Sequence, residues 1–290
     1  MGGQRLSTEI KPFRLKWAGG KRWLAEALVR NLGPASFADG LCEPFAGGAA
    51  LSFAADSPRI HLGDTNFDLV ETYRAIKSNS AAVAKSLAKL TLDEPTYLRV
   101  RAEAPVTRID RAVRMIYLNR TAFNGLWRVN QQGLFNVPFG CKPETRMPGA
   151  AELLQTAAML KRSKLEVGDF ERVAMQTLAG TVYFDPPYTV AHNHNGFVRY
   201  NERIFSWSDQ LRLASVASEL ADAGRTVVVS NADHADLRNL YRGGPFKLYR
   251  VRRPSNLAAN ADMRGSTTEL LAISRNVRLR SLPTFATRIS

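Results

Sequence analysis

The 290-residue sequence has few cysteines and no long apolar run. Its two cysteines, Cys42 and Cys141, lie far apart and form no C-x-x-C pair, which argues against a disulfide framework or a zinc knuckle. No stretch of about 18 uncharged apolar residues is present, so no membrane-spanning helix is expected. The first thirteen residues lack the apolar core of a secretory signal. We therefore expect a reduced, cytoplasmic protein without a membrane partner.

Acidic residues are also scarce, with 26 Asp and Glu against 40 Lys and Arg, which gives a net charge of +14. The excess lies in residues 99–146, with nine basic and three acidic residues, and in residues 242–290, with ten and two. Arginine outnumbers lysine in both segments, as is typical of phosphate and base contacts. These segments indicate a polyanionic partner. The alternative is two solvated faces that only keep the protein soluble.

Short apolar runs alternate with helical stretches towards both ends of the chain. A helix is expected to begin at Ser206 or Ser208 and to end at Gly224. This alternation predicts an α/β sheet with helices on both faces. Strands are predicted at residues 41–45, 60–63, 165–167, 181–184 and 226–230, followed by a closing pair at 247–251 and 269–273.

The middle of the sequence has a different pattern. Helices are predicted over residues 68–77, 81–90 and 108–119, and a β-hairpin over 126–140 with its turn at Gln132-Gly133. The sequence therefore predicts a discontinuous α/β domain, residues 1–65 and 156–290. A mostly helical domain with a hairpin, residues 66–155, is inserted into it and carries the first basic segment.

A glycine-rich turn, EPFAGGA at residues 43–49, follows the first predicted strand and precedes a helical run. Such a turn lets the chain approach a ligand closely at a helix N-terminus. Asp64 ends the next strand, where a doubly wound sheet places the acid that binds a ribose. Together they indicate an adenosine-containing ligand, although an ordinary tight turn is the alternative. The dinucleotide fingerprint G-x-G-x-x-G is absent.

The segment YFDPPY at residues 183–188 carries the sharpest signal. Its two prolines force an extended exit from the predicted strand at 181–184. An acid, a carbonyl and an aromatic ring would then lie at the carboxyl edge of the sheet, where ligands bind in open α/β folds. The alternative is an ordinary strand end in which Asp185 makes a turn hydrogen bond.

Five segments occur in one order between about residues 13 and 275: FRLKWAGGKRWL, EPFAGG, GDTNFDL, NRTAFNGLWRVNQQGLFNVPFG and YFDPPY. In this the chain resembles the Dam-type DNA adenine methyltransferases. The resemblance implies a Rossmann-like sheet with an inserted DNA-recognition domain, and methyl transfer from S-adenosylmethionine to the exocyclic amine of adenine in a short duplex site. The chain departs from the pattern at Ala49, where relatives often have glycine, and at Phe123, where some have tyrosine.

The residue types suit this chemistry. An aromatic amine is a poor nucleophile because its lone pair is delocalised into the ring. Asp185 and the Pro186 carbonyl would accept the two amine hydrogens and stabilise the positive charge that develops on the nitrogen. Pro187 completes the motif, and Tyr188 would stack on an adenine that has left the helix. This step needs no metal.

The resemblance also implies how the methyl donor is held. Asp64 would bind its ribose, Phe45 would pack beside it, and Gly47 lies in the turn that cradles it. Trp17 and Lys21 in the KWAGGKR segment would help to hold it, together with Asp185. The alternative for KWAGGKR is a basic surface loop.

For DNA, the resemblance implies recognition of GATC. Lys16 and Arg128 would donate to guanine acceptors, and Leu126 and Pro138 would contact a thymine methyl group. The remaining DNA contacts are expected from Arg111 and Arg114, which would meet phosphates, and from Phe123 and Asn124 beside the hairpin.

Other interpretations remain open at this point. The acceptor could be RNA, a protein glutamine or the cytosine amine, although related enzymes for these usually begin the motif with Asn or Ser. The chain could also be a catalytically silent DNA-binding regulator. His192 and His194 lie in a Gly/Asn-rich loop without a nearby cysteine or acid, so we expect no metal site. We expect a monomer.

Overall fold

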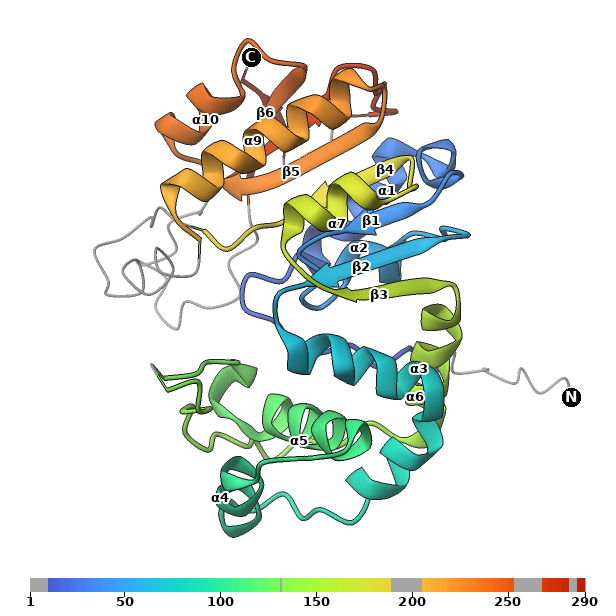
Figure 1. Ribbon diagram of the computed structural model, residues 1–290, viewed down its shortest axis with the longest axis vertical. Coiled ribbons are helices and arrows are strands. Elements are labelled where there is room, and N and C mark those ends of the chain that lie inside the picture. The colour runs from blue at the N-terminus through green and yellow to red at the C-terminus, as the bar shows by residue number, and fades with distance from the viewer. Residues whose placement is uncertain (1–9, 131, 189–204, 253–267, 282–285, 290) are drawn as a thin grey trace, which may run out of the picture. The chain divides into compact units, whose positions relative to one another are not determined.

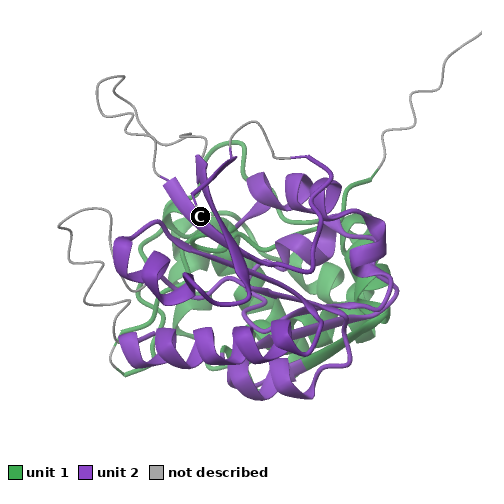
Figure 2. Ribbon diagram, turned by 90° about the horizontal axis from the view of Figure 1, so that it is seen from above, with its two compact units in different colours: residues 1–20, 66–165 green, residues 21–65, 166–290 purple. Residues whose placement is uncertain are grey.

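The computed structural model describes residues 10–130, 132–188, 205–252, 268–281 and 286–289. The chain forms two compact units (Figure 2). Unit 1 consists of Met1–Gly20 and Asn66–Leu165, and unit 2 consists of Lys21–Thr65 and Glu166–Ser290. Unit 1 therefore combines residues 66–155 with residues 1–20 and 156–165. Within the described residues, no helix is long and apolar enough to cross a membrane.

The central sheet has eight strands in the order β3-β2-β1-β4-β5-β7-β6-β8 (Figure 1). The strands are β1 Leu41–Glu43, β2 Ile60–Asp64, β3 Ser163–Val167, β4 Thr181–Phe184, β5 Thr226–Ala232, β6 Phe246–Arg252, β7 Thr268–Ser274 and β8 Ala286–Arg288. Strand β1 pairs in parallel with β2 and β4, and β4 with β5. Strands β5, β7, β6 and β8 pair antiparallel. The predicted α/β sheet is confirmed, although β1 ends at Glu43 because Pro44 has no backbone N–H to donate.

The strand order steps outward from β1 in both directions, so the chain changes direction between β1 and β4. In open α/β sheets this switch point, at the carboxyl edge, is where ligands bind. Of the sequence-predicted ligand groups, Asp64 is the last residue of β2 and Asp185 directly follows β4, and both strands belong to this parallel part. The topology therefore locates a candidate site before any side chain is considered.

Helices cover both faces of the sheet, as predicted. Helices α1 Arg22–Leu32 and α2 Ala50–Ala54, with the short helix η1 Pro34–Phe37, pack on one face. Helices α7 Phe170–Gln176, α9 Trp207–Asp222 and α10 Ala235–Tyr241 pack on the other. The strand side chains alternate between these two cores: Tyr183 belongs to the α1 face, whereas Val182 and Phe184 belong to the α9 face.

Helix α9 begins and ends where the sequence predicts. Ser206 is its N-cap, and its hydroxyl accepts a hydrogen bond from the Asp209 N–H. The Asp209 carboxylate bonds back to the Ser206 N–H at 2.9 Å, which completes a capping box. Gly224 follows the helix with a φ of +85°, a conformation that glycine adopts without strain.

Unit 1 is mostly helical. Its helices are α3 Phe67–Leu87, α4 Glu94–Ala102, α5 Arg108–Thr121, η2 Phe123–Gly125 and α6 Ala150–Lys161. The two helices predicted over 68–77 and 81–90 are present as the two parts of α3, which are separated by a kink where Asn79 has non-helical backbone angles, and the second part ends at Leu87. The Asn79 side chain accepts from the Ala82 N–H at 3.0 Å and so caps the second half of the helix.

The predicted hairpin is present in unit 1 as isolated bridges rather than as long strands. Val129 pairs with Phe135 in antiparallel fashion. At the turn, the Gly133 N–H donates to the Asn130 carbonyl at 3.0 Å, and Gly133 has a φ of +77°. The hairpin turns at Gln132-Gly133 as predicted, and the positive φ at Gly133 is one that glycine adopts without strain.

Candidate active site

Four polar side chains gather at the carboxyl edge of the sheet in unit 2. Glu43 is the last residue of β1, Asp185 directly follows β4, and Ser230 lies near the end of β5. Glu269 lies near the start of β7, which is antiparallel and therefore begins at the same edge. Side chains two positions apart on a strand point to the same face of the sheet. Each of the four residues is two positions from a residue of the core on the α1 face, so all four side chains point to that face. Those core residues are Leu41, Tyr183, Val228 and Leu271.

The Asp185 carboxylate is bound at one oxygen. Lys21 Nζ lies 2.9 Å from Oδ1, and the Ser230 hydroxyl donates to the same atom at 2.8 Å. Within the described part of the chain nothing bonds Oδ2. The Asp185 side chain is 19% exposed. One oxygen of Asp185 is thus fixed, and the other is left for a ligand.

Lys21 is the N-cap residue of α1 and is 2% exposed. Its Nζ also lies 3.7 Å from Oε2 of Glu269 and 4.7 Å from the centre of the Tyr188 ring. Burial, with Asp185 and Glu269 nearby, raises the pKa of Tyr188 well above its usual 10, so the ring stays neutral. Three residues predicted for the site, Lys21, Asp185 and Tyr188, therefore lie together.

Glu43 adds a third carboxylate to this edge. It is 2% exposed, and its Oε1 accepts from the Ser52 N–H in the first turn of α2 at 2.7 Å. Burial raises the pKa of Glu43 to about 7. Asp185 and Glu269 at one buried ammonium leave excess negative charge at this edge, which favours a positively charged ligand.

The glycine-rich turn lies against the end of β2. The Gly47 N–H donates to Asp64 Oδ2 at 3.0 Å, and the Ala46 N–H donates to the Gly63 carbonyl at 2.8 Å. Gly47 and Ala49 both have positive φ, +42° and +50°. Ala49 thus holds a left-handed conformation at the position where the resembled family often has glycine.

Phe45 belongs to a cluster of four aromatic rings on the α9 face, one of which is Phe184 of β4. It stacks on Phe170 with 5.1 Å between ring centroids, and it meets Phe205 edge-on at 5.5 Å. Phe170 is the first residue of α7, and Phe205 precedes α9. The sequence predicts Phe45 but not Phe170 or Phe205, because both resemble ordinary core residues beside a helix start.

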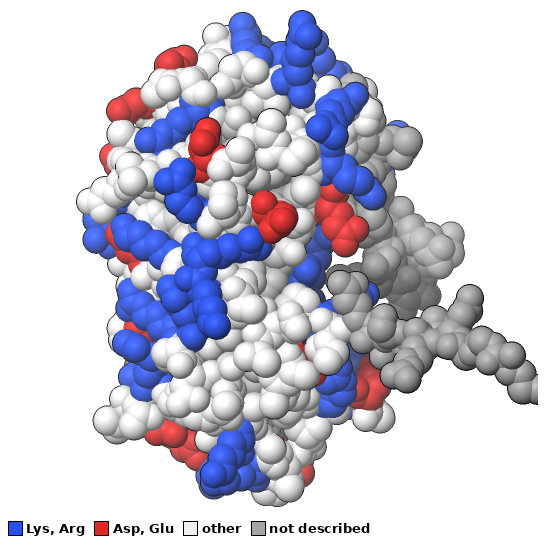
Figure 3. All heavy atoms as spheres, turned by 90° about the vertical axis from the view of Figure 1, so that its right-hand side faces the viewer, with Lys and Arg blue, Asp and Glu red and all other residues white. Residues whose placement is uncertain are grey.

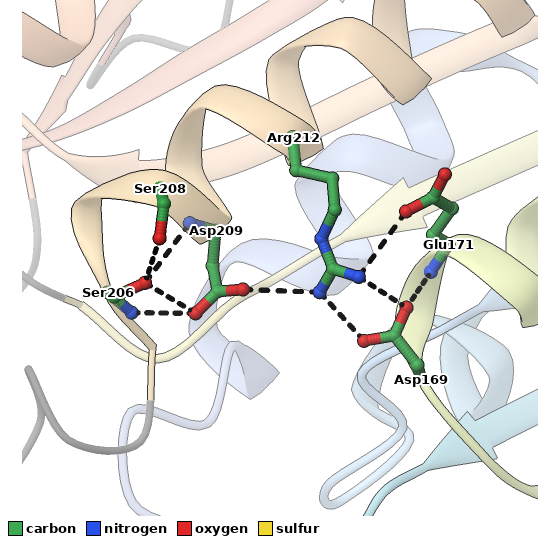
Figure 4. Close-up of polar contacts among 6 residues, drawn as sticks. All are labelled: Asp169, Glu171, Ser206, Ser208, Asp209 and Arg212. Carbon is green, nitrogen blue, oxygen red and sulfur yellow. Dashed lines mark hydrogen bonds and ion pairs between the residues drawn. The ribbon is translucent and has the colours of Figure 1, made fainter.

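A polar network holds the starts of α7 and α9 together (Figure 4). Arg212 of α9 pairs with Asp169 at 2.8 Å and with Asp209 at 3.1 Å, and it also reaches Glu171. Its guanidinium lies 4.5 Å from the centre of the Phe170 ring. Sequence reasoning missed Arg212, whose helical position alone gives no sign of this role.

In unit 1, a buried asparagine ties Lys16 to the start of the hairpin segment. The Lys16 N–H donates to Asn119 Oδ1 at 2.8 Å, and Asn119 Nδ2 donates to the Lys16 carbonyl at 2.6 Å. Asn119 Nδ2 also lies 3.3 Å from the carbonyl of Gly125, the residue before Leu126. Sequence reasoning missed Asn119, although a polar residue on the apolar side of a predicted helix is a signal that could have identified it.

Arg128 and Pro138 of the hairpin are exposed, whereas Phe135 and Val137 are buried. Arg128 Nε donates to Asn136 Oδ1 at 2.8 Å, which orients the guanidinium. The Phe123 ring is 52% exposed, and its N–H donates to the Pro138 carbonyl at 2.9 Å. Asn124 follows with a φ of +54°. The structure therefore brings the predicted residues Phe123 and Pro138 together on one surface.

Arg111 and Arg114 have partners within unit 1. Arg111 pairs with Asp68 at 2.8 Å, and Arg114 donates to the Arg101 carbonyl at 2.7 Å. Burial lowers the pKa of Arg114 below its usual value. Their predicted contacts with phosphates stay predictions.

The remaining predicted residues are Trp17, His192 and His194. Trp17 is half-buried in unit 1, where its carbonyl accepts from the Gly20 N–H at 3.0 Å. His192 and His194 lie outside the described residues. In the part of the chain that is described, no three His, Cys, Asp or Glu side chains form a group that could hold a metal ion.

Comparison with known proteins identifies the class of enzyme. The family model of the D12 class N6 adenine-specific DNA methyltransferases matches residues 17–256, so the chain belongs to this family. A type II methyltransferase, M.MjaIII, from Methanocaldococcus jannaschii is 33% identical over 86% of this chain and 93% of its own length. The DNA adenine methylase of Vibrio cholerae is 33% identical over 89% of this chain and 94% of its own length. The retron Ec67 DNA adenine methylase of Escherichia coli is 33% identical over 90% of each chain.

The chain is therefore an adenine-specific DNA methyltransferase, and DNA is its substrate. Membership of the family implies S-adenosylmethionine as the methyl donor. The resemblance noted from the sequence is confirmed at the level of the family.

Proposed function

We propose that this enzyme methylates the N6 amine of adenine within GATC in duplex DNA, and that Asp185 and the Pro186 carbonyl bind that amine. The observation that carries the proposal is the Asp185 carboxylate, which is fixed at Oδ1 and has no partner at Oδ2 among the described residues. A preorganised acceptor of this kind stabilises charge that develops in a transition state. Asp185 would stay an acceptor while the nitrogen–methyl bond forms and the sulfur–methyl bond breaks, and the methylated amine would then release one proton to solvent water.

The adenine must leave the double helix to reach this edge of the sheet. Tyr188 is the ring on which we place the extruded base, because it directly follows the two prolines and lies beside Lys21. Stacking on an aromatic ring offsets part of the cost of unstacking the base from its neighbours. Pro187 keeps the chain between Asp185 and Tyr188 extended.

The residues present fit the methyl donor. When bound, S-adenosylmethionine supplies an electrophilic methyl group on a positively charged sulfur, and the carboxylates at the sheet edge favour that charge. We assign the ribose to Asp64 and Gly47, whose carboxylate and N–H are joined by a hydrogen bond, and we assign packing beside it to Phe45. Lys21 and Trp17 complete the proposed set. We propose no metal in the reaction.

We assign DNA recognition to unit 1 and, within it, to residues 66–155. Figure 3 shows more Lys and Arg than Asp and Glu on one face of the molecule. In unit 1, residues 99–146 hold nine basic and three acidic residues, in keeping with a polyanionic substrate. Lys16 and Arg128 would donate to guanines, and Leu126 and Pro138 would contact a thymine methyl. Phe123 and Asn124 are exposed beside them. We assign phosphate contacts to Arg111 and Arg114.

The test is a methyl-transfer assay with purified protein, S-adenosylmethionine and duplexes that differ only in one site, GATC or a scrambled order of the same bases. Nucleoside mass spectrometry identifies the methylated base, and a nuclease blocked by adenine methylation maps its position. N6-methyladenine confined to GATC duplexes supports the proposal. N6-methyladenine mainly at other sites overturns the GATC assignment alone, whereas methylcytosine or methylated RNA overturns the acceptor.

A further inference from the structure

Two buried hydroxyl groups lie behind the Asp185 carboxylate. Tyr183 on β4 is opposite Val228 on β5, and Phe184 is opposite Val229, so the next pair in register is Asp185 and Ser230. Tyr183 is 2% exposed and Ser230 is 0% exposed. Both residues are therefore shielded from ligands and can affect a ligand only through Asp185.

The hydrogen bonds between these groups have a defined direction. The Ser230 hydroxyl donates to Asp185 Oδ1 at 2.8 Å, and the Tyr183 hydroxyl lies 3.0 Å from Ser230 Oγ. Because serine has one hydroxyl hydrogen, Tyr183 must be the donor to Ser230. Burial raises the pKa of Tyr183 well above its usual 10, which keeps its hydroxyl protonated. The chain Tyr183 to Ser230 to Oδ1 thus fixes the orientation of the carboxylate.

Glu269 acts on the same carboxylate through Lys21. An ammonium bound to Asp185 alone would neutralise it and weaken its second oxygen as an acceptor. Glu269 is 2% exposed and approaches the same Nζ, at 3.7 Å against 2.9 Å for Asp185. When all three groups are ionised their charges sum to −1, so the cluster keeps the negative charge of a lone aspartate.

We propose that Tyr183, Ser230 and Glu269 are positioning residues for Asp185. Tyr183 and Ser230 hold Oδ1 so that Oδ2 faces the amine, and Glu269 shares the charge of Lys21 so that Asp185 remains a strong acceptor. The inference rests on the proposed role of Asp185 in amine binding. It assigns to buried residues an effect on the rate of methyl transfer rather than on DNA binding.

Ser230→Ala tests the hydroxyl chain. Under single-turnover conditions with saturating donor and duplex, we expect the methylation rate constant to fall about tenfold or more, with DNA affinity unchanged. Ser274→Ala is the matched control, because Ser274 is 1% exposed in the same sheet and its hydroxyl accepts from the Val227 N–H. The control should lower the melting temperature without a comparable loss of rate.

Tyr183→Phe removes only the outer hydroxyl and should lower the rate constant by about three- to tenfold. Tyr241→Phe is its control, because Tyr241 is 1% exposed in the same unit and its hydroxyl has no hydrogen-bond partner among the described residues. Rates for Tyr183→Phe and Tyr241→Phe that both equal the wild-type rate would overturn the hydroxyl chain.

Glu269→Gln tests the shared charge through the ratio of the affinities for two ligands, which a purely structural role of Glu269 would leave unchanged. The transferred methyl must approach the amine held by Asp185, so the donor sulfur lies near this cluster. Loss of one negative charge should weaken S-adenosylmethionine, which carries a sulfonium, about three- to tenfold more than S-adenosylhomocysteine, which has a neutral sulfur. Glu166→Gln is the control: it removes a carboxylate on β3 that pairs with His61 and Arg172, and it should leave the ratio of the two affinities unchanged.

An unchanged affinity ratio in Glu269→Gln would overturn the role of Glu269. A Ser230→Ala rate constant within twofold of wild type, or reduced only as much as in Ser274→Ala, would overturn the role of Ser230. Both results require a wild-type enzyme that methylates adenine. If the wild-type enzyme methylates another base, the proposed function fails instead, and the two failures are therefore distinguishable.

Discussion

The carboxyl edge of unit 2 and the hairpin surface of unit 1 hold their functional side chains in opposite ways. At the edge, Lys21 and Glu269 are almost fully buried, and the Asp185 carboxylate is bound by two partners at one oxygen. On the hairpin surface, the side chains of Phe123 and Arg128 are exposed. Hydrogen bonds fix the nearby backbone instead: the Lys16 N–H donates to the Asn119 side chain, and the Phe123 N–H donates to the Pro138 carbonyl.

The difference follows from what each region must do. A group that stabilises developing charge has to be oriented before the reaction, because reorganisation during the reaction costs free energy. A group that reads base edges has to reach into a groove, so its side chain extends from a fixed backbone. Changes at the edge should therefore affect the rate, and changes on the hairpin should affect the choice of sequence.

Asp185→Ala should produce the largest effect. We expect the barrier to methyl transfer to rise by about 3 kcal/mol or more, because one preorganised acceptor is lost. The fold and duplex binding should persist, since Lys21 keeps Glu269 as a neighbour at 3.7 Å. Single-turnover kinetics, melting temperature and duplex affinity check this together. Near-wild-type methyl transfer by the variant would remove Asp185 from the catalytic role.

Glu43 should make unit 2 sensitive to pH. Its pKa is raised to about 7 from the usual 4.5, so the folded protein binds this proton more tightly than the unfolded chain does. That contribution to stability is fully present below about pH 4.5 and is lost as pH rises through about 7. The difference amounts to about 3 kcal/mol. Wild type should therefore lose more unfolding free energy than Glu43→Gln between pH 5 and pH 8.

Glu71 in unit 1 provides the control with the opposite sign. Although burial alone would raise the pKa of Glu71, hydrogen bonds from Arg74 and Arg108 lower it overall. Its contribution is present above the unfolded pKa and is lost as pH falls through the folded pKa. Glu71→Gln should therefore weaken the protein at pH 8 more than at pH 3. Equal pH dependence in both variants and wild type would contradict this contrast between the units.

Asp64→Ala should weaken the binding of S-adenosylmethionine by about 1.5–3 kcal/mol, because two ribose hydroxyls lose a charged acceptor. Calorimetry with donor alone measures this. Asp39→Ala is a suitable control, since Asp39 is exposed and precedes β1 at the opposite edge of the same sheet. Unchanged donor affinity in Asp64→Ala would move Asp64 out of the site.

Arg128→Ala should change specificity more than rate. We expect a loss of about 1–3 kcal/mol of discrimination at one base pair of the site, measured as the ratio of kcat/KM for duplexes that differ at that pair. Arg99→Ala removes the same charge from α4, where Arg99 pairs with Glu103, and should weaken all duplexes alike. Equal discrimination by wild type and Arg128→Ala would show that Arg128 contacts the phosphate backbone of the DNA rather than a base.

Much of the edge could be predicted from the sequence because Asp64 and Asp185 directly follow short apolar strands, and polar residues there reach the ligand edge. Ser230 and Glu269 could not be predicted. Ser230 lies near the end of β5 and Glu269 near the start of β7, and only the pairing order of β4, β5 and β7 brings both to the edge where Asp185 lies.

Unit 1 was less predictable for a related reason. Helix α4 carries several charges and has no clear apolar stripe, so its packing against α5 decides that it forms. The partners of Arg111 and Arg114 depend on the same packing. Asn119 reaches Lys16 across 103 positions of sequence, a separation that local patterns do not reveal.

Ala49→Gly should give the smallest effect, and it tests whether the edge is optimised for stability. Ala49 has a φ of +50°, where a Cβ costs free energy that glycine avoids. It is 0% exposed at the start of α2, so the substitution also removes a buried methyl group. The two terms oppose each other, and the left-handed conformation costs about 1–2 kcal/mol per residue, more than the ~0.8 kcal/mol of one buried methyl. We therefore expect Ala49→Gly to raise the unfolding free energy by up to about 1 kcal/mol. Ala50→Gly, one residue further into the helix, should lower it. Chemical denaturation of both variants measures the two signs, and destabilisation of similar size in both would show that the turn gains nothing from glycine.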